Sequence, residues 1–196
     1  FLLFLVITTV HGQAQWKFLI DVSGSMKVND PENQRQKALE IIGNIAPENL
    51  DVGIIVFAKE PKSLMSMTKV DDSWQSLYEQ QKGLIDYSGQ WTDIGKSLSN
   101  TLEDWPNPDN RHVILVTDGV VDVSAYREEN TQSRWHIFHH TLAKLQEKGI
   151  AIHTLSLGNQ SDLELLQVLS QATEGFYRQV DKAEEIYDYL VDLMKI

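Results

Sequence analysis

Short runs of consecutive apolar residues alternate along the chain with segments in which apolar residues recur every three to four positions. Four of these runs are expected to form strands, at residues 16–20, 52–57, 112–117 and 150–155. A continuous apolar run, unlike an alternating one, is typical of a parallel strand that is covered on both faces. A fifth run, at residues 175–180, is expected to form the last strand.

The intervening segments have the periodicity of helices, because each places its apolar residues on one face. These stripes are Ala38/Ile41/Ile42/Ile45, Ile94/Leu98/Leu102, Trp135/Phe138/Leu142/Leu145, Leu165/Leu166/Leu169/Ala172 and Ala183/Ile186/Tyr187/Leu190/Leu193. Pro31 suits a first helical position, Ser161 with Glu164 has capping-box spacing, and Gly149 is expected to end a helix. Alternating strands and helices predict an α/β fold with a doubly wound, mostly parallel central sheet flanked by helices on both faces.

Length and composition fit a single domain, and the N-terminal segment predicts its export. The 196 residues, of which 42% are hydrophobic, suffice for one sizeable core. A formal charge of −11 argues against nucleic acid as a partner, and the absence of cysteine excludes disulfides and thiolate metal sites. The apolar start, followed by small residues, predicts a signal peptide over residues 1–14 and a domain over 15–196, with an uncleaved anchor as the alternative.

Three segments far apart in the sequence end apolar runs or open helices with oxygen-bearing side chains. They contribute Asp21, Ser23 and Ser25 from the first, Thr92 from the second and Asp118 from the third. Mg²⁺ takes about six oxygen ligands in near-octahedral geometry, which hydroxyls, carboxylates and water can provide. With two carboxylates as the only full charges, such an ion keeps an exchangeable position. The pattern therefore predicts a divalent-metal site with room for a further carboxylate.

These five residues resemble the metal-ion-dependent adhesion site of the von Willebrand factor type A domain, which is Asp-x-Ser-x-Ser, then a Thr, then an Asp. The resemblance covers the chain from Gln15 onward and is strongest to exported bacterial members, which implies a periplasmic or cell-surface location. It implies that Ser23, Ser25 and Thr92 approach the metal, and that Asp21 and Asp118 act directly or through water. Mg²⁺ is the expected ion, with Mn²⁺ and Ca²⁺ as alternatives.

The resemblance implies a protein-binding domain, not an enzyme, whose partner presents an Asp or Glu to the metal. A metal-independent scaffold is the first alternative. The second is a phosphohydrolase with Asp21 as nucleophile, but Ser23 stands where such families place a second Asp, so the general acid is missing. Neither a membrane contact beyond the N-terminal segment nor an oligomeric state is predicted.

Two other patterns imitate functional sites. Residues 89–97 resemble a phosphate-binding loop, but five residues separate the glycines where the pattern requires four. His136 and His140 have helical spacing that could suggest zinc, yet relative to the apolar stripe of their helix they point toward solvent. We therefore interpret both patterns as structural.

Overall fold

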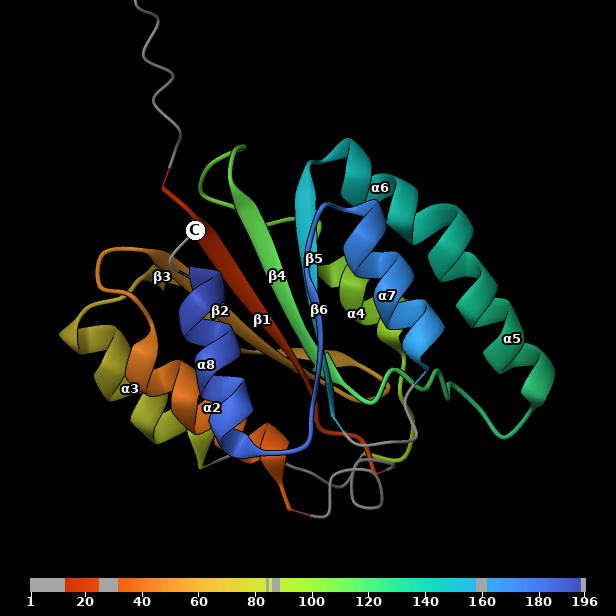
Figure 1. Ribbon diagram of the computed structural model, residues 1–196, viewed down its shortest axis with the longest axis horizontal. Helices are drawn as coiled ribbons and strands as arrows, with labels where there is room; N and C mark the ends of the chain where they lie inside the picture. Colours follow the sequence, from red (N-terminus) through yellow and green to blue (C-terminus); the bar gives the residue numbers. More distant parts are fainter. Residues whose placement is uncertain (1–12, 25–31, 84, 86–88, 158–161, 195–196) are drawn as a thin grey trace, which may run out of the picture.

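The computed structural model describes residues 13–24, 32–83, 85, 89–157 and 162–194. Its centre is a six-stranded sheet in the order β3-β2-β1-β4-β5-β6 (Figure 1). The strands are β1 (Gln15–Asp21), β2 (Asp51–Phe57), β3 (Pro61–Lys69), β4 (Arg111–Thr117), β5 (Ile150–Leu157) and β6 (Tyr177–Val180). All neighbouring pairs are parallel except β2 and β3. The predicted mostly parallel α/β sheet is confirmed, whereas most of the expected signal peptide, residues 1–12, lies outside the described residues.

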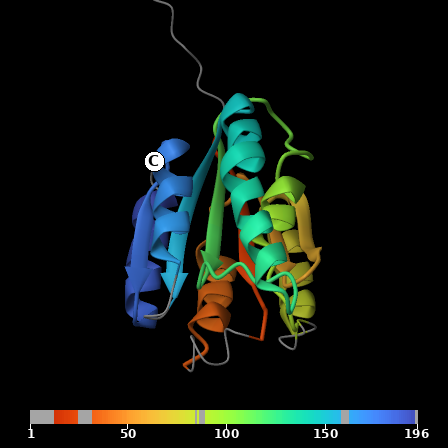
Figure 2. The same ribbon diagram turned by 90° about the vertical axis from the view of Figure 1, so that its right-hand side faces the viewer.

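Helices cover both faces of the sheet (Figures 1 and 2). One face carries α2 (Gln34–Ile45), α3 (Asp72–Lys82) and α8 (Ala183–Met194). The other carries α4 (Ile94–Asn100), α5 (Arg127–His136), the π-helical segment η1 (Ile137–Thr141), α6 (Leu142–Glu147) and α7 (Leu163–Ala172). Alternate residues of each strand point to opposite faces, so the sheet separates two apolar clusters. Within the described part of the chain, no helix combines the length and apolar character that crossing a membrane requires.

Two elements were absent from the sequence prediction. Strand β3 pairs antiparallel with β2 at the edge of the sheet, and most of its side chains are at least partly exposed. An edge strand with one neighbour needs no continuous apolar run, so its sequence does not stand out. Helix α3 likewise buries just two side chains, Trp74 and Tyr78, which gives it too narrow a stripe to detect.

The inward positions of two aromatic residues were predicted wrongly. Trp135 is 52% exposed, and Ile137 is buried in its place. The π-helical turns of η1 contain more residues than α-helical turns, so the buried face shifts relative to the predicted 3.6-residue period. Tyr187 is 49% exposed because α8 buries the narrow stripe Ile186, Leu190 and Leu193, which leaves Tyr187 beside that stripe.

The helix ends differ from expectation by a few residues. Helix α2 starts at Gln34 behind Asn33, whereas Pro31, the predicted first helical residue, lies outside the described residues. The side chain of Asp162 caps α7 by accepting a hydrogen bond from the Leu165 amide at 3.1 Å, so the cap is one residue later than Ser161. Ser161 also lies outside the described residues. Gly149 follows α6 with a φ of +59°, which confirms its predicted role.

Candidate metal site

The two aspartates of the predicted site lie at the ends of adjacent parallel strands. Asp21 is the last residue of β1 and Asp118 directly follows β4, and the two strands pair in register up to Ile20 and Val116. Both carboxylates are fully buried. Ligands of doubly wound sheets bind beyond the carboxyl ends of the strands, and these aspartates lie at that edge.

Asp21 is held by hydrogen bonds from both of these segments. Its Oδ1 accepts from the Ser23 amide at 2.9 Å, and its Oδ2 accepts from the Thr117 hydroxyl at 2.6 Å. Thr117 Oγ1 in turn accepts from the Gly119 amide at 3.0 Å. Thr117 was not among the predicted site residues. Its position beside Asp118 at the end of an apolar strand was the one sequence signal available for it.

Burial and charge work against ionisation of Asp21. Its pKa is raised to about 6, first by burial and second by the negative charge of Asp118, while hydrogen bonds from Ser23 and Thr117 partly offset both effects. Two carboxylates and a fully buried Ser23 side chain form an oxygen-rich donor set that suits a hard divalent cation. Such an ion would favour the charged form of both carboxylates.

Thr92 reaches this edge from a separate loop. It is buried, and its backbone pairs with Asp122: the Thr92 amide donates to the Asp122 carbonyl at 2.6 Å, and the Asp122 amide donates to the Thr92 carbonyl at 3.1 Å. Asp122 belongs to the loop that follows Asp118, so the two loops run side by side. The neighbouring Asp93 caps α4 by accepting from the Lys96 amide at 2.8 Å, which gives it a structural role.

Ser23 lies where the first loop meets the segment before Thr92. Ser23 forms a parallel bridge with Gly89, and the Gly24 amide donates to the Gly89 carbonyl. A Cβ at Gly89 would lie 2.3 Å from that of Ala58, so the close approach of residue 89 to Ala58 requires glycine. The structure thus places Asp21, at the end of β1, and Ser23, Thr92 and Asp118, in the adjoining loops, at one edge of the sheet. Ser25 lies outside the described residues.

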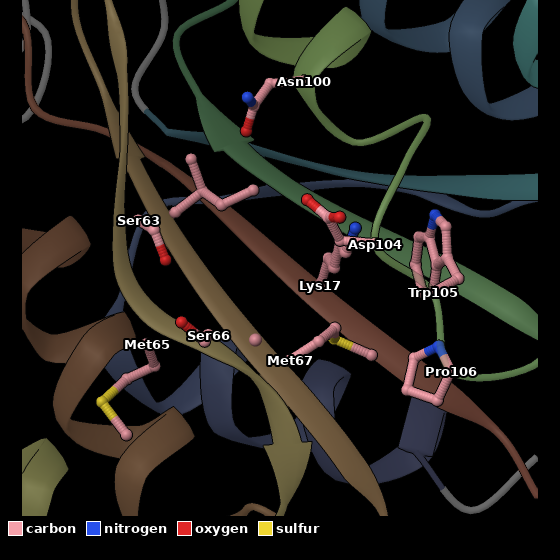
Figure 3. A pocket seen from close by; sticks show the side chains of 11 residues that line it. Lys17, Ser63, Met65, Ser66, Met67, Asn100, Asp104, Trp105 and Pro106 are labelled. Atoms are coloured by element: carbon pink, nitrogen blue, oxygen red, sulfur yellow. The ribbon is translucent and has the colours of Figure 1, made fainter.

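A separate cavity lies farther back on β1. It has a volume of about 500 Å³ and is lined by Lys17, Trp105 and residues of β2 and β3 (Figure 3). Lys17 Nζ lies 4.3 Å from the centroid of the Trp105 ring and donates to the Glu103 carbonyl. Burial lowers the pKa of Lys17 to about 8. Lys17 and Asp21 lie four positions apart along the extended strand, a distance of roughly 13 Å, so this cavity is distinct from the metal site.

Similarity to known proteins agrees with the architecture of this edge. The family model of the von Willebrand factor type A domain matches residues 17–192. The chain belongs to this family. Von Willebrand factor type A domains are typically adhesion or interaction modules and not enzymes. In the described residues, no three His, Cys, Asp or Glu side chains cluster in a way that could hold a metal ion.

The similar proteins come from diverse organisms. A von Willebrand factor A domain-containing protein of Dictyostelium discoideum is 25% identical over 97% of this chain and 20% of its own length. The chain thus spans about a fifth of the curated relatives it matches. A von Willebrand factor type A structure from Catenulispora acidiphila has a TM-score of 0.75 at 13% identity, covering 93% of this chain and 42% of its own.

A second similar structure carries a metal. Proximal thread matrix protein 1 from the mussel byssus, solved with a zinc-occupied adhesion motif, has a TM-score of 0.69 at 19% identity, covering 93% of this chain and 47% of its own. The family therefore includes proteins that bind divalent metal at this motif. Export of the present chain from a bacterium, and the boundary between residues 14 and 15, stay predictions.

Proposed function

We propose that this domain captures a partner protein through a divalent metal ion held by Asp21, Ser23, Ser25, Thr92 and Asp118. The observation that carries the proposal is the pair of fully buried carboxylates, Asp21 and Asp118, at the ends of adjacent strands. Burying two like charges side by side is unfavourable unless a cation compensates them. The metal-bearing mussel relative supports the same interpretation.

The roles of the residues follow from their chemistry. Asp21 and Asp118 supply the negative charge, while Ser23, Ser25 and Thr92 supply neutral oxygens, so the ion retains part of its charge for an incoming ligand. An Asp or Glu of the partner fits that requirement because a carboxylate is both anionic and oxygen-donating. Mg²⁺ is the proposed ion, with Mn²⁺ or Ca²⁺ as alternatives. The mode of action is binding, without catalysis.

Calorimetric titration with MgCl₂ and MnCl₂ tests the metal site. We expect the unmodified domain to bind, and Asp21→Asn and Ser23→Ala to lose most of the affinity while keeping the fold. Asp188→Asn, on the exposed face of α8, removes the same charge away from the site and should bind normally. Equal affinity in Asp21→Asn and Asp188→Asn would show that the site is assigned wrongly.

A capture assay distinguishes partner binding through the metal from the alternative function as a metal-independent scaffold. A surface displaying peptides that end in Asp or Glu should retain the domain in MgCl₂ and release it in EDTA. The same peptides with Asn or Gln in place of the acidic residue and with an amidated C-terminus should not retain it. Retention that is equal in EDTA would favour the scaffold. Phosphate release from a generic ester that Asp21→Asn abolishes would favour a hydrolase.

A further inference from the structure

Helix α5 contributes no candidate metal ligand, yet two of its side chains hold the loops that carry Thr92 and Asp118. These side chains are Asn130 and Arg134, which lie four residues apart and therefore on one face of the helix. No side chain of α5 is buried, so apolar packing alone does not explain the position of this helix.

Asn130 organises the loop that follows Asp118. Its Oδ1 accepts hydrogen bonds from the amides of Val123 and Ser124 at 2.8 and 3.0 Å. Its Nδ2 donates to Asp122 Oδ1 at 3.0 Å and to the Ser124 carbonyl at 3.1 Å. A side-chain amide offers two donors and accepts two hydrogen bonds, so all of its bonding capacity is used on this loop.

The loop that Asn130 holds is the one that positions Thr92. Asp122 exchanges two backbone hydrogen bonds with Thr92, at 2.6 and 3.1 Å. A shift of residues 122–124 therefore moves the Thr92 backbone with it. Asn130 thus acts on a proposed metal ligand through one intermediate residue.

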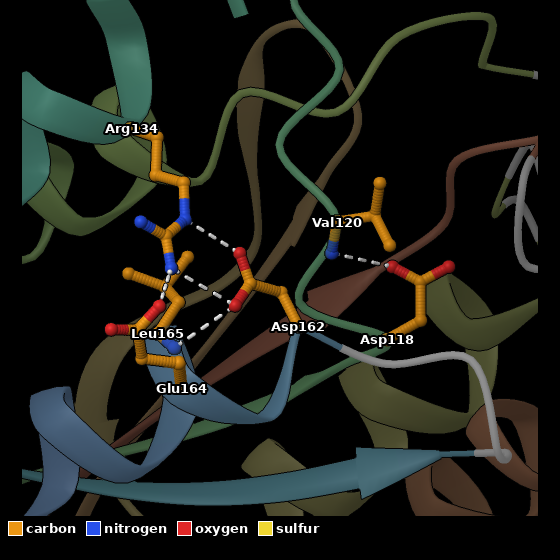
Figure 4. A network of polar contacts seen from close by, with 6 residues as sticks. All are labelled: Asp118, Val120, Arg134, Asp162, Glu164 and Leu165. Carbon is orange, nitrogen blue, oxygen red and sulfur yellow. Dashed lines mark hydrogen bonds and ion pairs between the residues drawn. The ribbon is translucent and has the colours of Figure 1, made fainter. Parts of the chain in front are cut away.

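Arg134 acts in the same way on Asp118 through Asp162, and Figure 4 shows the bonds of Arg134 to Asp162 and Glu164. Its Nε and Nη2 donate to the two carboxylate oxygens of Asp162 at 2.7 and 3.2 Å, and Nη2 also donates to Glu164 at 2.8 Å. The Asp162 amide donates to the Asp118 carbonyl at 3.1 Å. The planar guanidinium fixes the orientation of Asp162 in a way that a lysine ammonium cannot. Arg134 therefore ties α5 and the start of α7 to Asp118.

We propose that Asn130 and Arg134 are positioning residues that set the spacing between Thr92 and Asp118, and thereby the preference of the site for Mg²⁺ over Ca²⁺. This inference rests on the proposed function. Mg²⁺ requires near-ideal octahedral geometry at about 2.0–2.1 Å, whereas Ca²⁺ accepts six to eight oxygens at about 2.3–2.6 Å. Loosening either loop therefore weakens Mg²⁺ binding more than Ca²⁺ binding.

Calorimetry of single variants tests the selectivity. We expect Asn130→Ala and Arg134→Met each to raise the Kd for Mg²⁺ by about 10-fold or more, as is usual for residues that orient metal ligands. The Kd for Ca²⁺ should rise several times less. Arg134→Lys should behave like Arg134→Met. Gln132→Ala and Arg127→Met, at exposed positions of the same helix, are the matched controls and should leave both Kd values unchanged.

Hydrogen exchange in EDTA tests the positioning without any metal. Asn130→Ala should speed exchange of the Thr92 and Asp122 amides, and Arg134→Met that of the Asp162 amide, relative to core amides of β4. An unchanged Mg²⁺ to Ca²⁺ ratio together with unchanged exchange would overturn the inference. If the unmodified domain binds neither ion, the proposed function and the selectivity fail together, while the exchange measurement still decides the positioning role.

Discussion

Replacing Asp118 with asparagine should make the metal-free domain more stable and abolish its response to metal. At neutral pH, a carboxyl group with a pKa of about 6 in the folded protein and 3.8 in the unfolded chain opposes folding by about 3 kcal/mol. Burial of Asp21 is the larger cause and the charge of Asp118 the smaller one, so removing that charge should recover part of this free energy, on the order of 1 kcal/mol. Asparagine keeps an oxygen for the Val120 amide, which donates to Asp118 Oδ1 at 3.0 Å.

Urea denaturation at pH 7.5 is the assay, with each protein measured in EDTA and in MgCl₂. In EDTA, Asp118→Asn should be more stable than the unmodified domain by about 1 kcal/mol. At a metal concentration 100 times the Kd, the unmodified domain should gain about 2.7 kcal/mol and the variant nothing, so the order of stability reverses. At pH 4 in EDTA the advantage should vanish, because Asp21 is protonated below its pKa of about 6 and no longer repels Asp118.

Two results would refute this reasoning. If Asp118→Asn is less stable than the unmodified domain in EDTA, the two carboxylates do not oppose each other in the fold. If the variant still gains stability from MgCl₂, Asp118 does not hold the ion. Asp188→Asn controls for the change in net charge and should match the unmodified domain under both conditions.

Further predictions concern the rest of the fold. The pKa of His153 is lowered to about 3 by burial and by neighbouring His112, so the unfolded chain takes up a proton below about pH 6.5 that the folded protein refuses. Lowering the pH from 7 to 5 should therefore reduce the free energy of unfolding by about 2 kcal/mol. In urea denaturation, His153→Asn should lose about 2 kcal/mol less than the unmodified domain over the same pH range. Gly175→Ala would place a Cβ 2.0 Å from the Ile152 carbonyl oxygen and should lose about 3 kcal/mol or more. Gly83→Ala, whose Cβ would have no atom within 4 Å beyond its chain neighbours, should be neutral or slightly stabilising, and urea denaturation measures both variants.

The sequence predicted those parts of the fold that local patterns determine. Five strands were recognisable, four of them because parallel strands buried on both faces must be apolar throughout, and the ends of β1 and β4 therefore indicated where Asp21 and Asp118 lie. Strand β3 and the phase of the helix around Trp135 were not recognisable. An exposed edge has no such constraint, and a π-helical turn leaves no mark in a 3.6-residue period.

The positions of the site residues were deducible, but their supports were not. Asp21, Ser23 and Asp118 could be grouped because strand ends of a parallel sheet meet at one edge, whereas Thr92 was added because it precedes a predicted helix and completes the resemblance to the adhesion site. The bonds made by Asn130 and Arg134 join segments that are unrelated in sequence pattern, since an asparagine or arginine on an exposed helix face is unremarkable. Such contacts depend on how α5 sits over the loops, which is known from the folded structure alone.

The placement of the aspartates explains why the carboxylates of the site destabilise the folded domain in the absence of metal. Asp21 ends β1 and Asp118 directly follows β4, two central strands of the sheet, where burial holds both residues in place and also raises the pKa of Asp21. A site on the exposed edge strand β3 would leave the carboxylates solvated, with less need for a cation and less precise spacing. The central strands therefore hold the two carboxylates in fixed positions where they repel each other. A divalent ion bound between them removes this repulsion and finds its ligands already in place. This coupling is why the stability of the domain is expected to report directly on metal binding.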